Sequence, residues 1–146
     1  MPKSADLRTK ATLYGAAHFK GVAVPVSPDK GDEGESMVVH SLAHLRLSRM
    51  GSLTAPGELA DPDHLFSQHA GRITHVTVWS SRPATWHLDP EERGRTWQQY
   101  DADTGDLGAW ADRSRYVRVW SQKDGAEINT DPLEPGGPSR LITVVE

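Results

Sequence analysis

Apolar residues alternate with other residues in several short stretches of the chain, and this spacing predicts β-strands. Within residues 11–27, Val22, Val24 and Val26 occupy every second position, and β-branched residues favour a pleated strand. Residues 72–81 carry apolar side chains on both faces, so we expect this strand in the centre of a sheet. Further strands are expected over residues 84–88, 96–100, 116–121 and 141–145.

The stretch 36–50 fits two different patterns. Val38, Leu42 and Leu45 lie at i, i+4 and i+7, which predicts a helix that ends before Gly51. A strand is the alternative, because apolar residues also alternate with other residues at a second set of positions. That set is Val39, Ala43, Leu45 and Leu47. We favour the helix and keep the strand open.

Two Asp-Pro pairs mark the starts of further helices. Asp61-Pro62 and Asp89-Pro90 each place an acidic N-cap before a proline at the first helical position. The first of these helices is expected over residues 61–70. The second is limited to one or two turns, since Gly94 follows closely.

Polar, glycine-rich and proline-rich stretches separate these elements. Residues 28–35 read as an acidic loop in solvent with no buried member, and residues 122–139 read as a long irregular connection. Residues 1–9 are expected to form a flexible arm. The chain as a whole, 1–146, has the length of a single domain.

The predicted elements do not alternate as strand and helix, which argues against a doubly wound parallel sheet. We expect an α+β fold in which a small, mainly antiparallel sheet of six to seven short strands carries two or three short helices. A partly closed small β-barrel is the alternative.

Composition narrows the classes of protein that fit. The 146 residues include no cysteine, which excludes disulfide scaffolds, thiol nucleophiles and cysteine-ligated metals. No apolar run approaches the roughly 20 residues that span a bilayer, and Met1–Asp6 lacks the apolar core of a secretory signal. We therefore expect a cytoplasmic protein without membrane contact. Abundant Ala, Gly, Asp and Arg suggest a bacterial or phage source.

Aromatic and cationic residues gather in the second half of the chain, where all five tryptophans follow residue 78. If residues 116–121 form a strand, Tyr116, Arg118 and Trp120 share one face, and Val117 and Val119 share the other. The valines are expected in the core, so the other face predicts a partly exposed aromatic–arginine strip. Trp, Tyr and Arg dominate protein interfaces. The predicted binding residues are Tyr116, Arg118, Trp120, Arg115 and Trp97. The alternative is a strand buried on both faces.

Histidines supply the candidate metal ligands. His40 and His44 would lie one turn apart on a helix, a spacing that can hold a divalent metal such as zinc or nickel. A third ligand would have to come from His75, His87 or Asp89. The alternative places His40 and His44 on the surface as ordinary polar residues.

Two further segments suggest chemistry. His75, His87 and Asp89 are candidate catalytic residues, because Asp89 could orient His87 as a general base. The alternative role of Asp89 is a helix N-cap. The acidic residues of 101–112 partly resemble a calcium-binding loop, although the spacing departs from the EF-hand pattern. The alternative for this segment is an acidic hairpin turn.

These observations favour a non-enzymatic protein-binding or assembly module, such as an accessory, structural or inhibitor protein. Its partner would be another protein or a second copy of the chain. A small histidine-based enzyme, assisted by a divalent metal, is the first alternative; no cofactor is otherwise required. A binder of single-stranded nucleic acid is the second, and the net charge of −4 speaks against it.

Overall fold

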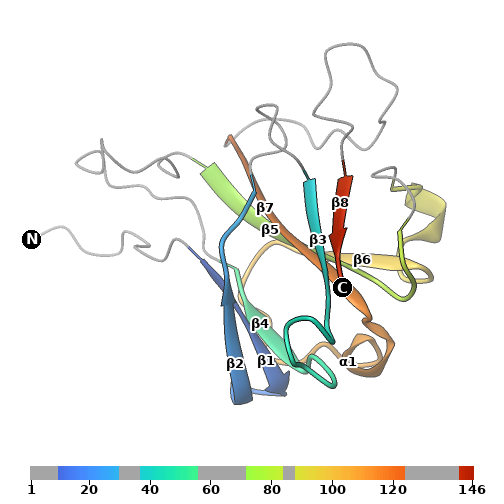
Figure 1. Cartoon of the computed structure of the whole chain (residues 1–146). Coiled ribbons are helices and arrows are strands. Elements are labelled where there is room, and N and C mark those ends of the chain that lie inside the picture. The colour runs from blue at the N-terminus through green and yellow to red at the C-terminus, as the bar shows by residue number, and fades with distance from the viewer. Residues whose placement is uncertain (1–9, 30–36, 56–71, 84–87, 124–141) are drawn as a thin grey trace, which may run out of the picture.

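The computed structural model describes residues 10–29, 37–55, 72–83, 88–123 and 142–146 (Figure 1). Within these ranges the architecture is all-β, with eight strands in two sheets. Among the described residues, helical structure is limited to the 3-10 helix η2 (Pro90–Glu92) and the single turn of α1 (Trp110–Arg113). Neither of these described helices has the length and apolar character needed to cross a bilayer.

The smaller sheet has three antiparallel strands in the order β2-β1-β4. These strands are β1 (Ala11–Ala16), β2 (Lys20–Val26) and β4 (Ser52–Thr54). Alternation explains β1, because Ala11 and Leu13 are buried while Thr12 and Tyr14 are half-buried. The valines of β2 that predicted a strand do form one.

The larger sheet has five strands in the order β6-β5-β7-β3-β8. All its pairs are antiparallel except the parallel pair of β3 and β8 at one edge. The strands are β3 (Met37–Ser41), β5 (Arg72–Trp79), β6 (Trp97–Tyr100), β7 (Tyr116–Lys123) and β8 (Ile142–Val145).

The two sheets enclose the first of two hydrophobic clusters. Leu13 of β1 and Leu53 of β4 meet Val76, Val78 and the valines of β7 in this cluster. The prediction that Val117 and Val119 face a core is confirmed. Because the chain passes from the small sheet to the large one and back again, this core joins segments far apart in sequence.

A second cluster lies on the opposite face of the large sheet. It contains Met37 and Val39 from β3, Leu88, and three tryptophans. The tryptophans are Trp79, Trp97 and Trp120. The central strands β5 and β7 are therefore buried on both faces, as the pattern of residues 72–81 predicts.

The expected α+β class is wrong, because the predicted helix over 36–50 is a strand followed by a tight turn. Burial alternates along β3, where Met37, Val39 and Ser41 are buried and Val38 and His40 are half-buried. The helical spacing of apolar residues was coincidental, and the alternative of a strand holds for residues 37–41. The two separate sheets also replace the partly closed barrel.

Some of the remaining predicted segments fall within the described residues and others do not. The short helix after Asp89 is confirmed as η2, and the Asp89 carboxylate accepts a hydrogen bond from the backbone of Glu91 at 3.0 Å. The acidic loop is not wholly exposed, since Pro28 is buried and the Asp29 side chain is 8% exposed. The predicted helix over 61–70, the arm 1–9, and all of the 84–88 strand except Leu88 lie outside the described residues. So does the 122–139 connection beyond Lys123.

Candidate binding groove

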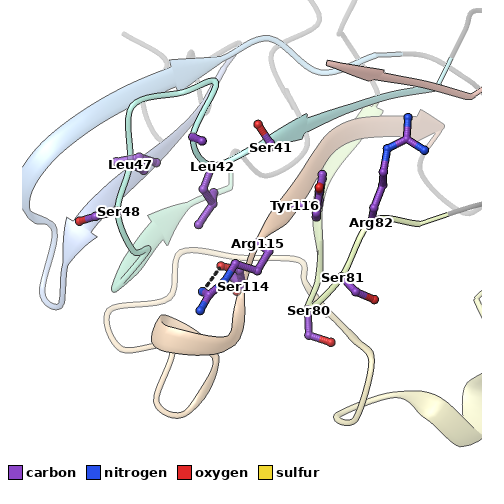
Figure 2. A pocket seen from close by; sticks show the side chains of 11 residues that line it. Ser41, Leu42, Leu47, Ser48, Ser80, Ser81, Arg82, Ser114, Arg115 and Tyr116 are labelled. Carbon is purple, nitrogen blue, oxygen red and sulfur yellow. Dashed lines mark hydrogen bonds between the residues drawn. The ribbon is translucent and has the colours of Figure 1, made fainter. Parts of the chain in front are cut away.

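An open groove of about 550 Å3 lies where three strands of the large sheet begin or end (Figure 2). Its walls come from the turn after β3, the segment after β5 and the start of β7. The lining residues are Ser41, Leu42, Ala43, Leu47, Ser48, Ser80, Ser81, Arg82, Ser114, Arg115 and Tyr116.

Strand register brings these segments together. Trp79 at the end of β5 pairs with Tyr116 at the start of β7, and Tyr116 also pairs with Ser41 at the end of β3. The backbone N–H of Leu42 then donates to the carbonyl of Arg115 at 2.9 Å. The groove thus rests on a hydrogen-bonded framework, which favours a fixed shape.

The serines of the groove divide into two groups. Ser114 donates to the Trp110 carbonyl at 2.7 Å, and Ser41 accepts from the backbone N–H of His44 at 3.0 Å, so these hydroxyls hold the surrounding turns. Ser80 also belongs to this first group, since it donates to the Thr96 carbonyl at 3.4 Å, whereas Ser48 and Ser81 are exposed. With Leu42 beneath, the groove offers hydroxyl groups beside an apolar surface, a mixture typical of binding sites.

Charge at one end of the groove comes from two arginines and one carboxylate. The Tyr116 hydroxyl donates to Oε1 of Glu146 at 2.8 Å, and Arg82 Nε lies 3.4 Å from the same oxygen. The hydrogen bond to the Glu146 carboxylate raises the pKa of Tyr116. Arg115 donates to the carbonyl oxygens of Asp112 and Ser114 at 2.6 and 3.1 Å.

The predicted aromatic–arginine strip is divided between groove and interior. Tyr116 is half-buried and Arg115 is exposed, and both line the groove. Arg118 is 1% exposed and Trp120 is 3% exposed, so the prediction of a partly exposed strip is wrong for both. The alternative of a strand buried on both faces describes this part of β7.

Arg118 is buried because Asp29 accepts a bidentate ion pair from it. Its Nε and second terminal nitrogen lie 2.8 and 2.5 Å from the two carboxylate oxygens. The backbone of Asp29 also bonds to Val119 and Ser121, which fixes the chain after β2 against β7. Arg118 stacks on the Trp120 ring at 4.8 Å from its centroid. The pair joins the two sheets through the linker between them.

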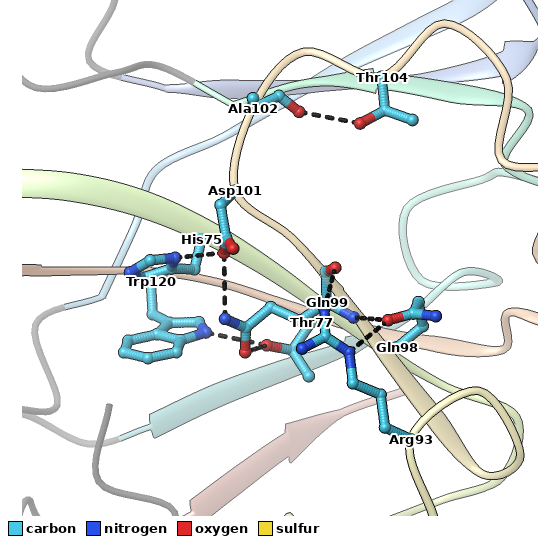
Figure 3. Close-up of polar contacts among 9 residues, drawn as sticks. All are labelled: His75, Thr77, Arg93, Gln98, Gln99, Asp101, Ala102, Thr104 and Trp120. Atoms are coloured by element: carbon cyan, nitrogen blue, oxygen red, sulfur yellow. Dashed lines mark hydrogen bonds and ion pairs between the residues drawn. The ribbon is translucent and has the colours of Figure 1, made fainter. Parts of the chain in front are cut away.

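Trp120 belongs to a polar network under the second cluster (Figure 3). Its indole nitrogen donates to Thr77 at 3.0 Å, and Thr77 contacts the side chain of Gln99 at 3.3 Å. Trp97 is 7% exposed and donates to the Asp89 carbonyl at 2.9 Å. Trp97 and Trp120 are therefore structural in the described part of the chain and are withdrawn as surface binding residues.

His75 and Asp101 form a close pair in the same network. His75 Nδ1 lies 2.5 Å from the Asp101 carboxylate, and this hydrogen bond lowers the pKa of Asp101. His75 is 5% exposed and packs on the Trp120 ring, with centroids 4.6 Å apart. Its Nε2 is buried and has no hydrogen-bond partner within the described ranges. Burial closes His75 to substrate, which counts against acid–base catalysis there.

The other catalytic candidates do not join this pair in the described structure. His87 lies outside the described residues. Asp89 is exposed and serves as the N-cap of η2. The capping role that was the alternative for Asp89 is confirmed.

The two candidate metal ligands do lie side by side, although the helix that would have placed them is absent. The rings of His40 and His44 stack with centroids 5.7 Å apart and an interplanar angle of 11°. Burial and the neighbouring His44 lower the pKa of His40. No group of three histidine or carboxylate ligands gathers anywhere in the described ranges, so a third ligand is missing there.

The acidic segment 101–112 is a series of capped turns. Asp103 accepts from the backbone N–H of Ala55 at 3.0 Å, and Asp106 accepts from that of Gly108 at 2.8 Å. Asp112 lies 3.2 Å from Arg49. Because each of these three carboxylates already has a partner within the protein, the alternative of an acidic turn accounts for them.

Most of the site was missed in the sequence, including Ser81, Arg82 and Glu146. Ser81 closes the strand predicted over residues 72–81, Arg82 follows it directly, and Glu146 follows a strand without any motif. Their approach depends on the pairing of β5 with β7, of β7 with β3 and of β3 with β8. The available signal was a Ser-Ser-Arg sequence at the end of the strongest strand, where binding residues often occur in loops.

Comparison with known proteins finds similarity only among solved structures; no protein-family model and no curated protein matches the chain. A betagamma-crystallin domain from Clostridium beijerinckii is 19% identical, with a TM-score of 0.47 over 76% of this chain and 97% of that one. The N-terminal domain of protein S is 13% identical, with a TM-score of 0.47 over 78% and 98%. Hahellin, a beta-gamma crystallin, is 16% identical, with a TM-score of 0.46 over 82% and 99%. The function of this chain is therefore inferred from its own residues.

Proposed function

We propose that the chain is a non-enzymatic binding module whose groove receives a segment of a partner protein. The observation that carries the proposal is the open groove itself, in which hydroxyl groups and guanidinium groups surround an apolar floor. Its volume of about 550 Å3 suits a few side chains of a partner. Tyr116 and Arg115, which line it, belong to residue types that dominate interfaces.

The groove is poorly equipped for catalysis. Its serine hydroxyls are weak nucleophiles unless a general base activates them. The lining residues that the structure describes include no histidine, and the Glu146 carboxylate at the rim contacts Tyr116 and Arg82 rather than a serine hydroxyl. His75, the histidine paired with a carboxylate, is buried in the second cluster. A surface that binds without reacting accounts for these features better than an active site does.

A photo-crosslinking experiment tests the proposal. A photoreactive phenylalanine analogue replaces Ser48 in the groove or, as the matched control, Ala23 on the exposed face of β2. We expect Ser48 to crosslink a protein from an extract of the source cells, and Ala23 not to. The captured protein is then purified and its affinity measured by calorimetry.

The decisive variant is Ser81→Trp, which fills the groove with an indole. We expect affinity for the purified partner to fall by at least about tenfold, a loss of about 1.4 kcal/mol. Ala23→Trp, on the other sheet, should leave affinity unchanged. Equal crosslinking from both positions, or full affinity in Ser81→Trp, would contradict the proposal. Sedimentation of the protein alone shows whether the partner is a second copy.

A further inference from the structure

One end of the groove already holds a carboxylate, supplied by Glu146. Val145 of β8 pairs with His40 of β3, and the next residue of β3, Ser41, pairs with Tyr116 of β7. Three adjacent strands therefore bring Glu146, Ser41 and Tyr116 into a row. The register of these three strands places the Glu146 carboxylate at the rim of the groove.

A hydroxyl donor and a guanidinium group converge on a single oxygen of that carboxylate. Tyr116 donates its hydroxyl proton to Oε1 at 2.8 Å, and Arg82 Nε stands 3.4 Å from the same atom. Hydrogen bonds between an ionised acceptor and such donors are stronger than neutral ones. Tyr116 and Arg82 together form a subsite that can recognise one carboxylate group.

The ion pair between Arg82 and Glu146 contributes little binding energy. The side chain of Arg82 is 57% exposed, and that of Glu146 is 51% exposed. Ion pairs with such exposure contribute little, because water screens them and both side chains lose freedom. A carboxylate from another molecule, supported by further contacts in the groove, would displace Glu146.

The surroundings attract an anion although the whole chain has a net charge of −4. Arg115 lines the groove and is exposed, and it donates hydrogen bonds to the neutral carbonyl oxygens of Asp112 and Ser114. A local positive field draws carboxylates toward the groove.

We propose that Arg82 and Tyr116 bind an aspartate or glutamate side chain of the partner, and that Glu146 competes for this subsite as an internal inhibitor. The inference rests on the proposed function, because it names the chemistry of the partner segment that enters the groove. The affinity for the partner then depends on how readily its carboxylate replaces that of Glu146.

The test titrates three probes into 15N-labelled protein and follows the Arg82 Nε–H signal by NMR. The probes are a glutamate-rich decapeptide, the same peptide with glutamine for glutamate, and sodium acetate. We expect the glutamate peptide to shift Arg82 and the glutamine peptide not to. Acetate separates the two sources of carboxylate: binding as tight as the peptide would mean a small-molecule site and would overturn a protein partner.

The Glu146→Gln variant tests whether Glu146 competes with the peptide for Arg82 and Tyr116. We expect the Kd of the glutamate peptide to fall about two- to fivefold, the factor that matches release of an exposed ion pair. The pKa of Tyr116 should also fall toward its ordinary value, since the carboxylate that raises it has gone. An unchanged Kd together with an unchanged Tyr116 titration would overturn the competition.

Arg82→Gln and a matched control complete the design. Arg82→Gln should abolish binding of the glutamate peptide, which calorimetry measures because this variant lacks the Arg82 signal. Arg49→Gln, at an exposed arginine that pairs with Asp112 outside the groove lining, should leave it intact. Glutamate and glutamine peptides that bind equally would overturn the inference. If a partner is nevertheless lost in Ser81→Trp, the proposed function survives without the carboxylate subsite.

Discussion

At the scale of single residues, the ion pair of Arg118 and Asp29 stands out because both side chains are nearly inaccessible, at 1% and 8% exposure. Removing charges from water is costly, and the bidentate geometry repays the cost only while both partners remain. The pair also fixes Val38, whose backbone N–H donates to Asp29 Oδ2 at 3.1 Å. Asp29 therefore holds the linker between the sheets against both β7 and β3.

Asp29→Ala should lower the free energy of unfolding by about 3–5 kcal/mol, because it leaves the Arg118 charge buried without its carboxylate. Urea denaturation measures this loss. The double variant Asp29→Ala/Arg118→Met should lose less than Asp29→Ala alone. Arg49→Ala, which breaks an exposed pair with Asp112, is the control, with an expected loss below about 1 kcal/mol. A loss from Asp29→Ala as small as the control's would contradict this account.

His40 is the second residue with a consequence for stability, this time as a function of pH. Burial is the largest cause of its lowered pKa, the positive charge of His44 adds to it, and Asp29 opposes both. The unfolded chain therefore binds a proton at His40 more readily than the folded chain. Stability from this residue is complete above pH 6.5, the ordinary value, and falls as the pH drops toward the folded pKa.

The His44→Gln variant should raise the pKa of His40, because it removes a like charge, yet leave it below 6.5 through burial. NMR titration of the imidazole signals measures the shift. His40→Gln should remove this residue's share of the stability loss below pH 6.5. A His40 pKa in the wild type at or above 6.5 would refute the explanation.

At the scale of elements, the turn that links β3 to β4 shows how the helix was wrongly predicted. Arg46 adopts a positive φ of 61°, and the Leu47 N–H donates to the Leu42 carbonyl at 2.9 Å, so the chain reverses within a few residues. Gly51 does not end a helix. It enters β4 at a point of close backbone approach, where the absence of a side chain is required.

Gly51→Ala should destabilise the fold, since a Cβ would stand 2.5 Å from backbone atoms of both Ala16 and Ala17. Backbone cannot yield as a flexible side chain does, so we expect a loss at or above the upper end of about 1–3 kcal/mol. Thermal or urea unfolding gives the value. Gly105→Ala is the matched control, because its Cβ would meet the Phe19 ring at an ordinary 3.7 Å. Equal losses in the two variants would rule out the steric explanation.

The strands could be predicted from the sequence, whereas the residues that their side chains contact could not. The two-sided apolar pattern of residues 72–81 correctly placed β5 inside a sheet, and alternating valines marked β2 and β7. The same alternation could not tell which face of β7 meets solvent, because the Arg118 face carries polar groups that Asp29 and Thr77 satisfy. Those partners lie 89 and 43 residues from the groups they bond, too far for a local pattern to reveal.

At the scale of the whole molecule, one five-stranded sheet separates two hydrophobic clusters. The small sheet covers one face, and the second cluster with its three tryptophans occupies the other. The groove lies at the ends of the strands, where backbone pairing stops and turn residues take over. Composition predicted a chain with long polar connections, but the place where its turns converge depends on strand order.

The candidate site was predictable only in part for the same reason. Tyr116 and Arg115 were chosen for their residue types, and both line the groove. Arg82 and Glu146 lie 64 positions apart along the chain, and only the order β5-β7-β3-β8 brings them together. Spacing rules for helices and strands describe neighbours in sequence and cannot supply this contact.

The burial of β7 on both faces has a consequence for how this protein changes over evolutionary time. Residues Val117–Ser121 are all inaccessible, so selection for folding alone would hold them nearly constant in descendants. The groove is built largely from serines in turns, which tolerate replacement whenever a partner changes. A search for invariant positions would therefore highlight Arg118 and Trp120, whereas the residues that set partner preference would be found among those that diverge between lineages.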